Sequence, residues 1–243
     1  QKFPNFPKLW MIAGQLYEQF GDNNLAAKYY EEGVNHNKNS VPLWICWINL
    51  EIKQGNFAKA RSIWERARIK NPNSSDLWYT AVKLELADKN PTGAKYNLNR
   101  GLQEVPKSGE LWALSIEMEP RHLRTAKSLE AMKQCDNDAF VILAVAKQFW
   151  REKKYEKAKK WLERAVIVNK DYGDAWVYYY MFERDHGEKG GTEDILKRVK
   201  EAEPHHGRLW ISVSKKVENW RLKSDEILLK AVEHIEGEFD VIE

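Results

Sequence analysis

Residues 60–72 read ARSIWERARIKNP, and residues 158–170 repeat the pattern as AKKWLERAVIVNK. Both stretches have alanine at their first position, Glu-Arg-Ala at the sixth to eighth positions, and asparagine at the twelfth. Ala60, Ile63, Trp64 and Ala67 recur at the spacing of one helical face. A helix with a tryptophan among arginines fits either an RNA-binding surface or one unit of a packed scaffold. The second copy favours the packed unit.

Tryptophans recur at a fixed interval, and this is the strongest periodic signal in the chain. The interval from Trp10 to Trp44 recurs from Trp44 to Trp78 and from Trp78 to Trp112. The same interval separates Trp176 from Trp210. An acid stands seven positions after the tryptophan in four units, as Glu51, Glu85, Glu119 and Glu183. A proline stands six positions before the tryptophan in four cases, as Pro4, Pro72, Pro106 and Pro204. A period of this length predicts a helical repeat protein.

The period divides the chain into seven units. They are predicted to begin near Lys8, Pro42, Asp76, Glu110, Asn137, Asp174 and Arg208. The fourth unit is short, because Ala126 follows Trp112 more closely than Ala60 follows Trp44, and its inter-helix turn is expected to have lost two positions. The seventh unit is expected to be trimmed in the same way, at Ser224. Pro4 fits the tail of an earlier repeat, so we expect the chain to be part of a longer protein.

Each unit is predicted to form two helices. Trp44, Ile48 and Glu51 fall on one helical face, and the proline near the end of the second helix cannot continue it. The turn between the helices is expected to use a left-handed glycine, as Gly21, Gly55 or Gly187. Neither helix buries its apolar face alone, so the units must stack. The predicted fold is an all-α, right-handed α-α superhelix that forms one solenoid over residues 1–243.

The spacing resembles two related repeat families. Trp44, Ala60, Trp64 and Pro72 fit the tetratricopeptide pattern, whereas Ile48 stands where that pattern has a small glycine. The helix-one glutamate and the Glu-Arg-Ala of helix two resemble half-a-tetratricopeptide (HAT) repeats. Stretches such as FPKLWMIAGQL (6–16) and AEPHHGRLWISVSKKVENW (202–220) resemble the C-terminal repeats of the pre-mRNA-processing factor 6 family. This resemblance implies a nuclear scaffold that bridges proteins of the spliceosomal tri-snRNP.

Composition and charge narrow the function further. Lys plus Arg number 39 against 36 Asp plus Glu, so the net charge of +3 gives no overall basic footprint for nucleic acid. Cys46 and Cys135 have neither disulfide nor zinc spacing. No apolar run is long enough to cross a bilayer, and no phosphate-binding loop or catalytic motif occurs. The sequence predicts no enzyme, cofactor, metal site, membrane contact or small-molecule substrate.

The residues of the repeat motif are assigned to structure. A tryptophan series on one helical face favours core packing over base stacking. The charged members recur once per repeat, whereas an active site needs one convergent cluster, so they are expected to form inter-helix charge pairs. The set comprises Trp10, Trp44, Glu51, Ala60, Arg61, Trp64, Glu65, Arg66, Ala67, Pro72, Trp78, Glu85, Pro106, Trp112, Glu119, Glu163, Arg164, Ala165, Trp176, Glu183, Pro204 and Trp210.

Two local clusters and two alternative functions stay open. The densest basic stretch holds Lys153, Lys154, Lys157, Lys159 and Lys160, which are candidate contacts for RNA or an acidic partner. His205 and His206, with His186 upstream, fit a surface turn better than a metal site. Direct RNA binding is the main alternative function. A peptide clamp would need Lys, Asn and Arg facing one groove, which the sequence does not place.

Overall fold

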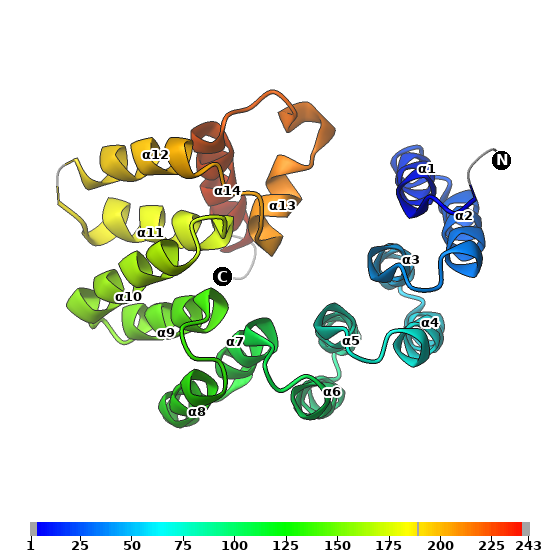
Figure 1. Ribbon diagram of the computed structural model, residues 1–243, viewed down its shortest axis with the longest axis horizontal. Coiled ribbons are helices and arrows are strands. Elements are labelled where there is room, and N and C mark those ends of the chain that lie inside the picture. Colours follow the sequence, from blue (N-terminus) through cyan, green and yellow to red (C-terminus); the bar gives the residue numbers. More distant parts are fainter. Residues whose placement is uncertain (1–3, 189, 240–243) are drawn as a thin grey trace. The chain divides into compact units, whose positions relative to one another are not determined.

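Helices account for the fold in the part of the chain that the structure describes. The computed structural model describes residues 4–188 and 190–239 and contains fourteen α-helices, one short 3-10 helix and no strand within those ranges (Figure 1). The helices follow one another as antiparallel pairs. The predicted class, an all-α repeat fold of helix pairs, is confirmed.

The helices form seven pairs along the chain. The pairs are α1 (Pro7–Gln19) with α2 (Asn23–His36), α3 (Val41–Lys53) with α4 (Phe57–Lys70), α5 (Ser75–Ala87) with α6 (Pro91–Glu104), α7 (Gly109–Met118) with α8 (Arg121–Gln134), α9 (Ala139–Arg151) with α10 (Tyr155–Val168), α11 (Gly173–His186) with α12 (Gly191–Ala202), and α13 (Arg208–Ser214) with α14 (Ser224–Phe239). The 3-10 helix, Val217–Asn219, lies between α13 and α14. Each first helix begins close to a predicted repeat start.

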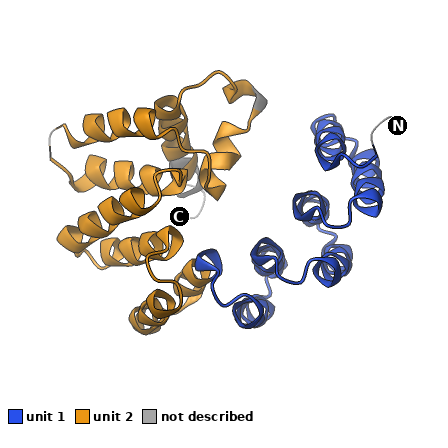
Figure 2. Cartoon of the chain, in the orientation of Figure 1, with its two compact units in different colours: residues 1–111 blue, residues 112–243 orange. Residues whose placement is uncertain are grey.

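The chain divides into two compact units, residues 1–111 and 112–243 (Figure 2). In the first unit, α1 packs on α2 and on α3, and α3 packs on α4 and on α5. In the second unit, one buried apolar cluster runs from Ala139 to Ile235 through α9 to α14. Helices that cannot bury their apolar faces alone thus bury them against neighbours.

Several helices begin at side chains that cap them. Asp22 accepts a hydrogen bond from the backbone N–H of Leu25 at 3.0 Å, and Asn90 accepts one from Gly93 at 3.0 Å. Asp138 caps α9 by accepting from two backbone N–H groups. These side chains satisfy donors that the first helical turn leaves unpaired.

The turns inside the pairs use left-handed residues, with one correction to the prediction. Gly21 (φ 81°) and Gly55 (φ 75°) are left-handed as expected, and Lys89 (φ 55°) and Lys153 (φ 60°) take the same conformation. The prediction for Gly187 is wrong. This residue is extended at φ −87° and ends α11 by donating its N–H to the Glu183 carbonyl. A longer connection follows it before α12 begins.

The shortened repeats lose residues from their first helices. α7 has 10 residues, whereas α3 and α5 have 13 each, and only Glu119 and Pro120 separate α7 from α8. Proline disfavours helical conformation in the residue before it, which ends α7 early. The seventh repeat likewise has a first helix of only 7 residues. The expectation that the inter-helix turn alone is trimmed is therefore corrected.

Candidate protein-interaction surface

The repeat tryptophans lie in the core rather than on a binding surface. Trp10, Trp44, Trp64, Trp78, Trp112, Trp176 and Trp210 are all at most 6% exposed. The indole N–H groups of Trp10, Trp44 and Trp176 each donate to the carbonyl oxygen six residues upstream, 2.8 Å away in every case. These tryptophans thus fasten the turn that enters their repeat, and they present no free ring face on which a base could stack.

An asparagine ladder, which sequence reasoning missed, joins successive turns. Asn37 donates to the carbonyl of Pro4 at 2.9 Å, and Asn71 donates to the carbonyl of Lys38 at 3.1 Å. Each carbonyl also receives the indole N–H of its own repeat. The signal was available, because the two asparagines are one tryptophan period apart at the ends of second helices.

Charged motif residues pair between successive repeats. Arg61 on α4 donates two hydrogen bonds of 2.8 Å to the Glu85 carboxylate on α5 and also contacts Asp88. The hydrogen bonds from Arg61 hold the pKa of Glu85 below its ordinary value. Lys159 on α10 pairs with Glu183 on α11 at 2.9 Å. Because both pairs have the same separation in sequence, Lys159 is the counterpart of Arg61 and not an unpaired surface lysine.

Glu51 is buried without an arginine partner. Ala27 stands one period before Arg61, so the preceding repeat offers no cation at that position. Glu51 instead accepts hydrogen bonds from Trp47 and Asn56 and pairs with Lys59 at 2.6 Å, all within its own repeat. A fully buried carboxylate therefore keeps three polar partners.

The remaining motif residues divide between the core and the surface. Ala60, Ala67 and Ala165 are fully buried. Glu163 accepts a hydrogen bond from the Tyr179 hydroxyl at 3.1 Å, and Glu119 is half-buried at the end of α7. Glu65 and Arg164 are on the surface, where Glu65 pairs with Arg68 and Arg164 donates a hydrogen bond to Asn137. Pro72 and Pro106 are also exposed, whereas Pro204 is buried.

Two lysines of the basic stretch, which spans the α9–α10 turn and the start of α10, are already paired with carboxylates. Lys154 pairs with Glu152 at 2.6 Å, and Lys159 is taken by Glu183. Lys153, Lys157 and Lys160 are exposed, and no ion pair is recorded for them within the described residues. Three of the five predicted lysines therefore remain available to a partner.

The neighbouring histidines join two inter-repeat turns. Their ring Nδ1 atoms lie 3.0 Å (His205) and 3.2 Å (His206) from the Asp171 carboxylate, and His206 forms an isolated parallel bridge with Tyr172. Partial burial raises the pKa of Asp171, but the hydrogen bonds from His205 and the charges of both histidines outweigh it and leave the pKa lowered. Residues 4–188 and 190–239 hold no group of three or more His, Cys, Asp or Glu side chains that could bind a metal. Nor is any helix in those ranges long and apolar enough to cross a membrane.

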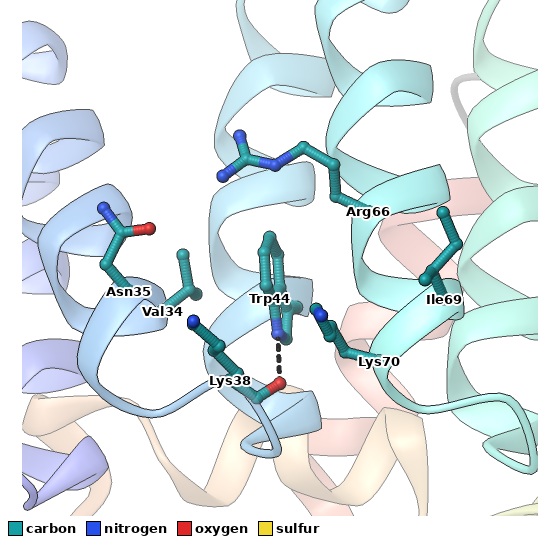
Figure 3. A pocket seen from close by; sticks show the side chains of 7 residues that line it. All are labelled: Val34, Asn35, Lys38, Trp44, Arg66, Ile69 and Lys70. Carbon is teal, nitrogen blue, oxygen red and sulfur yellow. Dashed lines mark hydrogen bonds between the residues drawn. The ribbon is translucent and has the colours of Figure 1, made fainter.

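A groove in the first unit gathers cations around an apolar floor (Figure 3). It has a volume of about 160 Å³. Trp44 of α3 and Val34 of α2 form the floor, and both are nearly inaccessible to solvent. The rim carries Lys38 from the α2–α3 turn and residues from the end of α4, which are Arg66, Ile69 and Lys70, with Asn35 of α2 opposite.

The cations of this groove are not neutralised by nearby carboxylates. The Arg66 guanidinium lies over the rings of Trp44 and Trp47, 5.6 Å from each centroid. No ion pair joins Lys38, Arg66 or Lys70 to a carboxylate among the described residues. This groove places Lys, Asn and Arg side chains together, which the sequence alone did not do.

Comparisons with known proteins point to splicing factors. The family model described as Suppressor of forked protein (Suf) matches residues 25–142, and a tetratricopeptide repeat model matches residues 7–39. Human pre-mRNA-processing factor 6 is 44% identical over 119 residues, which are 49% of this chain and 13% of that protein. The pre-mRNA-splicing factor prp1 of Schizosaccharomyces pombe is 34% identical over 230 residues, which are 95% of this chain and 25% of that protein. The chain thus spans a quarter or less of the length of these two relatives.

A solved structure supports the fold alone. A tetratricopeptide repeat protein from Parabacteroides merdae superposes with a TM-score of 0.53 at 16% identity, covering 93% of this chain and 84% of that one. The likeness agrees with the helix-pair architecture.

Proposed function

We propose that this chain, which is a HAT-repeat protein similar to pre-mRNA-processing factor 6, is a non-catalytic scaffold that bridges proteins of the spliceosomal tri-snRNP in the nucleus. The similarity to a splicing factor over 95% of the chain supports a role in pre-mRNA splicing. The positions and contacts of the repeat-motif side chains support the scaffold role. Its aromatic members are buried, and most of its charged members are paired between or within repeats.

The observation that carries the proposal is the pairing of charges between repeats. Arg61 with Glu85, and Lys159 with Glu183, use the polar groups of the motif to hold neighbouring helices. A rigid stack of this kind presents many separate surface positions, and their combined binding exceeds that of any one contact.

Affinity capture from nuclear extract tests the proposal. The tagged chain, shown to be helical by circular dichroism, is expected to recover proteins of the splicing particles. Capture is repeated in extract treated with ribonuclease, because the scaffold function predicts retention through protein contacts. Recovery of no splicing-particle protein by the folded chain would contradict the proposal.

Direct RNA binding is the second candidate, and the exposed lysines at the start of α10 and in the turn before it favour it. Lys153, Lys157 and Lys160 lie on one short stretch and have no recorded ion pair among the described residues. If RNA is the main ligand, splicing proteins are lost from the captured set after ribonuclease treatment. Reversal of these three charges would then lower RNA affinity steeply at low salt.

A further inference from the structure

The groove over Trp44 differs from the equivalent place in the next repeat. The residue one period after Val34 is Arg68, whose guanidinium lies 5.8 Å from the centroid of the Trp78 ring and pairs with Glu65. A cation tied to its own helix therefore stands where the groove over Trp44 has the small apolar side chain of Val34.

The rim of the groove also changes along the first unit. Pro72 stands one period after Lys38, and Glu104 stands one period after Lys70. The third repeat thus replaces one rim cation with a neutral residue and reverses the sign of the other. Gln103 takes the place of Ile69, which is 68% exposed.

The sixth repeat keeps a lysine, Lys170, at the position of Lys38, but it differs at the positions of the other two cations. Arg198 lies over Trp176 at 5.3 Å, as Arg66 lies over Trp44, but Arg198 also contacts Asp194 at 3.6 Å. The positions equivalent to Ile69 and Lys70 are Glu201 and Ala202. Stacking of arginine on the repeat tryptophan is therefore common to these repeats. The second repeat differs because its groove has three cations that form no ion pair among the described residues, next to the exposed Ile69.

We propose that this groove binds an extended acidic segment of a protein partner, with carboxylates at Lys38, Arg66 and Lys70 and an apolar side chain against Ile69. The inference rests on the proposed scaffold function and names the chemistry of one of its partners. Opposite charge supplies the attraction and the register, and the apolar contact adds affinity.

The groove suits a carboxylate-bearing peptide better than RNA. Trp44 is only 3% exposed, its N–H is bound to the Lys38 carbonyl, and Arg66 lies over its ring. A nucleobase would need a free aromatic face.

A labelled peptide of alternating glutamate and leucine is the probe. Its fluorescence anisotropy is titrated with the folded chain, beside one peptide with glutamine for glutamate and another with serine for leucine. We expect the first peptide to bind most tightly, and its affinity to fall as salt is added. Failure of the acidic peptide to bind more tightly than the glutamine peptide would overturn the proposal.

Charge reversal at the rim locates the binding. Lys38→Glu with Lys70→Glu is expected to weaken binding by about tenfold or more, since each reversed charge repels the peptide. Both side chains are exposed, so the variant should fold. Lys28→Glu with Lys107→Glu is the matched control, because it makes the same change in net charge at exposed residues outside the groove. Equal weakening by both double variants would contradict the assignment.

The apolar contact and the alternative ligand have their own tests. Ile69→Gln, which copies Gln103 of the next repeat, is expected to weaken the leucine peptide several-fold and to leave the serine peptide unchanged. A single-stranded RNA that binds more tightly than the acidic peptide, and loses binding in the Lys38→Glu, Lys70→Glu variant, would make the groove a nucleic-acid site instead.

Failure of this inference is distinguishable from failure of the proposed function. If the unmodified chain and the Lys38→Glu, Lys70→Glu variant capture the same splicing proteins in the same amounts, the groove proposal falls and the scaffold function stands. If the unmodified chain captures no splicing protein yet binds the acidic peptide through the groove, the proposed role in splicing is wrong, whereas the proposed binding of acidic segments is supported.

Discussion

Three buried glutamates show how single residues connect the repeats. Glu51, Glu85 and Glu183 are at most 6% exposed, and a buried carboxylate is costly unless it is paired and hydrogen-bonded. Arg61 and Lys159 supply the partner from the preceding repeat, whereas Lys59 supplies it to Glu51 from within the repeat. The same sequence position thus acts between repeats or inside one, depending on which residue stands upstream.

The Glu85 ion pair should make stability depend on acid. Its lowered pKa means that the stabilisation is complete above the ordinary glutamate pKa and is lost as the pH falls through the lowered value. Glu85→Gln should cost about 1 kcal/mol at pH 7, because Arg61 is partly exposed and keeps Asp88. Urea denaturation of both proteins at pH 7 and pH 3 should show the difference shrinking at pH 3.

The matched control for this pair is Glu65→Gln. Glu65 pairs with Arg68 on the surface, so its removal should change stability little at either pH. A difference between Glu85→Gln and the unmodified chain that is equal at pH 7 and pH 3 would rule out the ion pair as its cause.

At the scale of the element, the turn inside each pair sets where the second helix begins. Gly21 and Gly55 adopt left-handed conformations, and a Cβ added at either would meet no atom within 4 Å. Lys89 and Lys153 hold the same conformation with a side chain. Backbone strain is therefore separable from packing at these positions.

Two reciprocal substitutions should reveal this strain. Gly55→Ala is expected to lower the free energy of unfolding by about 1 kcal/mol, because a left-handed alanine is strained. Lys89→Gly should raise it by an amount of similar size or less, since glycine relieves the strain but gains freedom in the unfolded chain. Thermal denaturation measures both. Stabilisation by Gly55→Ala would show that the left-handed conformation does not persist in solution.

At the scale of the whole molecule, helices contact neighbours in the chain and stability should be local. Within the second unit, α11 packs against α10, α12, α13 and α14. Stability in such an array is close to a sum of repeat and neighbour terms. A lesion in one unit should therefore be felt most by the helices packed around it.

Hydrogen exchange can map this locality. Trp176→Ala removes a nearly inaccessible side chain and its bond to the Lys170 carbonyl, and it should cost about 3–5 kcal/mol. Protection is expected to fall in α9 to α14 and to persist in α1 to α5. Trp220→Ala is the control, because Trp220 is 70% exposed. A uniform loss of protection along the chain would contradict local stability.

Much of this fold could be predicted because the tryptophan period is encoded locally. The recurrence of Trp44 at Trp78, and of the residues 60–72 pattern at residues 158–170, reports the helix pairs directly. The groove could not be predicted in the same way. Val34, Lys38 and Lys70 belong to two repeats, and each lies near a helix end or in a turn. The distances between them depend on how the two repeats pack together.

The sequence by itself determined the helix-pair repeat and the buried face that carries its tryptophans, because both follow from periodicity along a single chain. It aligned Ala126 of the fourth repeat with Ala60, whereas Ala126 is exposed and Ala60 is fully buried, so the register of that second helix came from the tertiary structure. The tertiary structure alone decided which cation meets which carboxylate. It assigned Lys159 to Glu183, although the sequence placed that lysine in a basic patch. It also left Lys38, Arg66 and Lys70 without carboxylate partners among the described residues, around one apolar floor. Charges act over distances of a few ångströms, and only the stacking of one repeat on the next sets those distances.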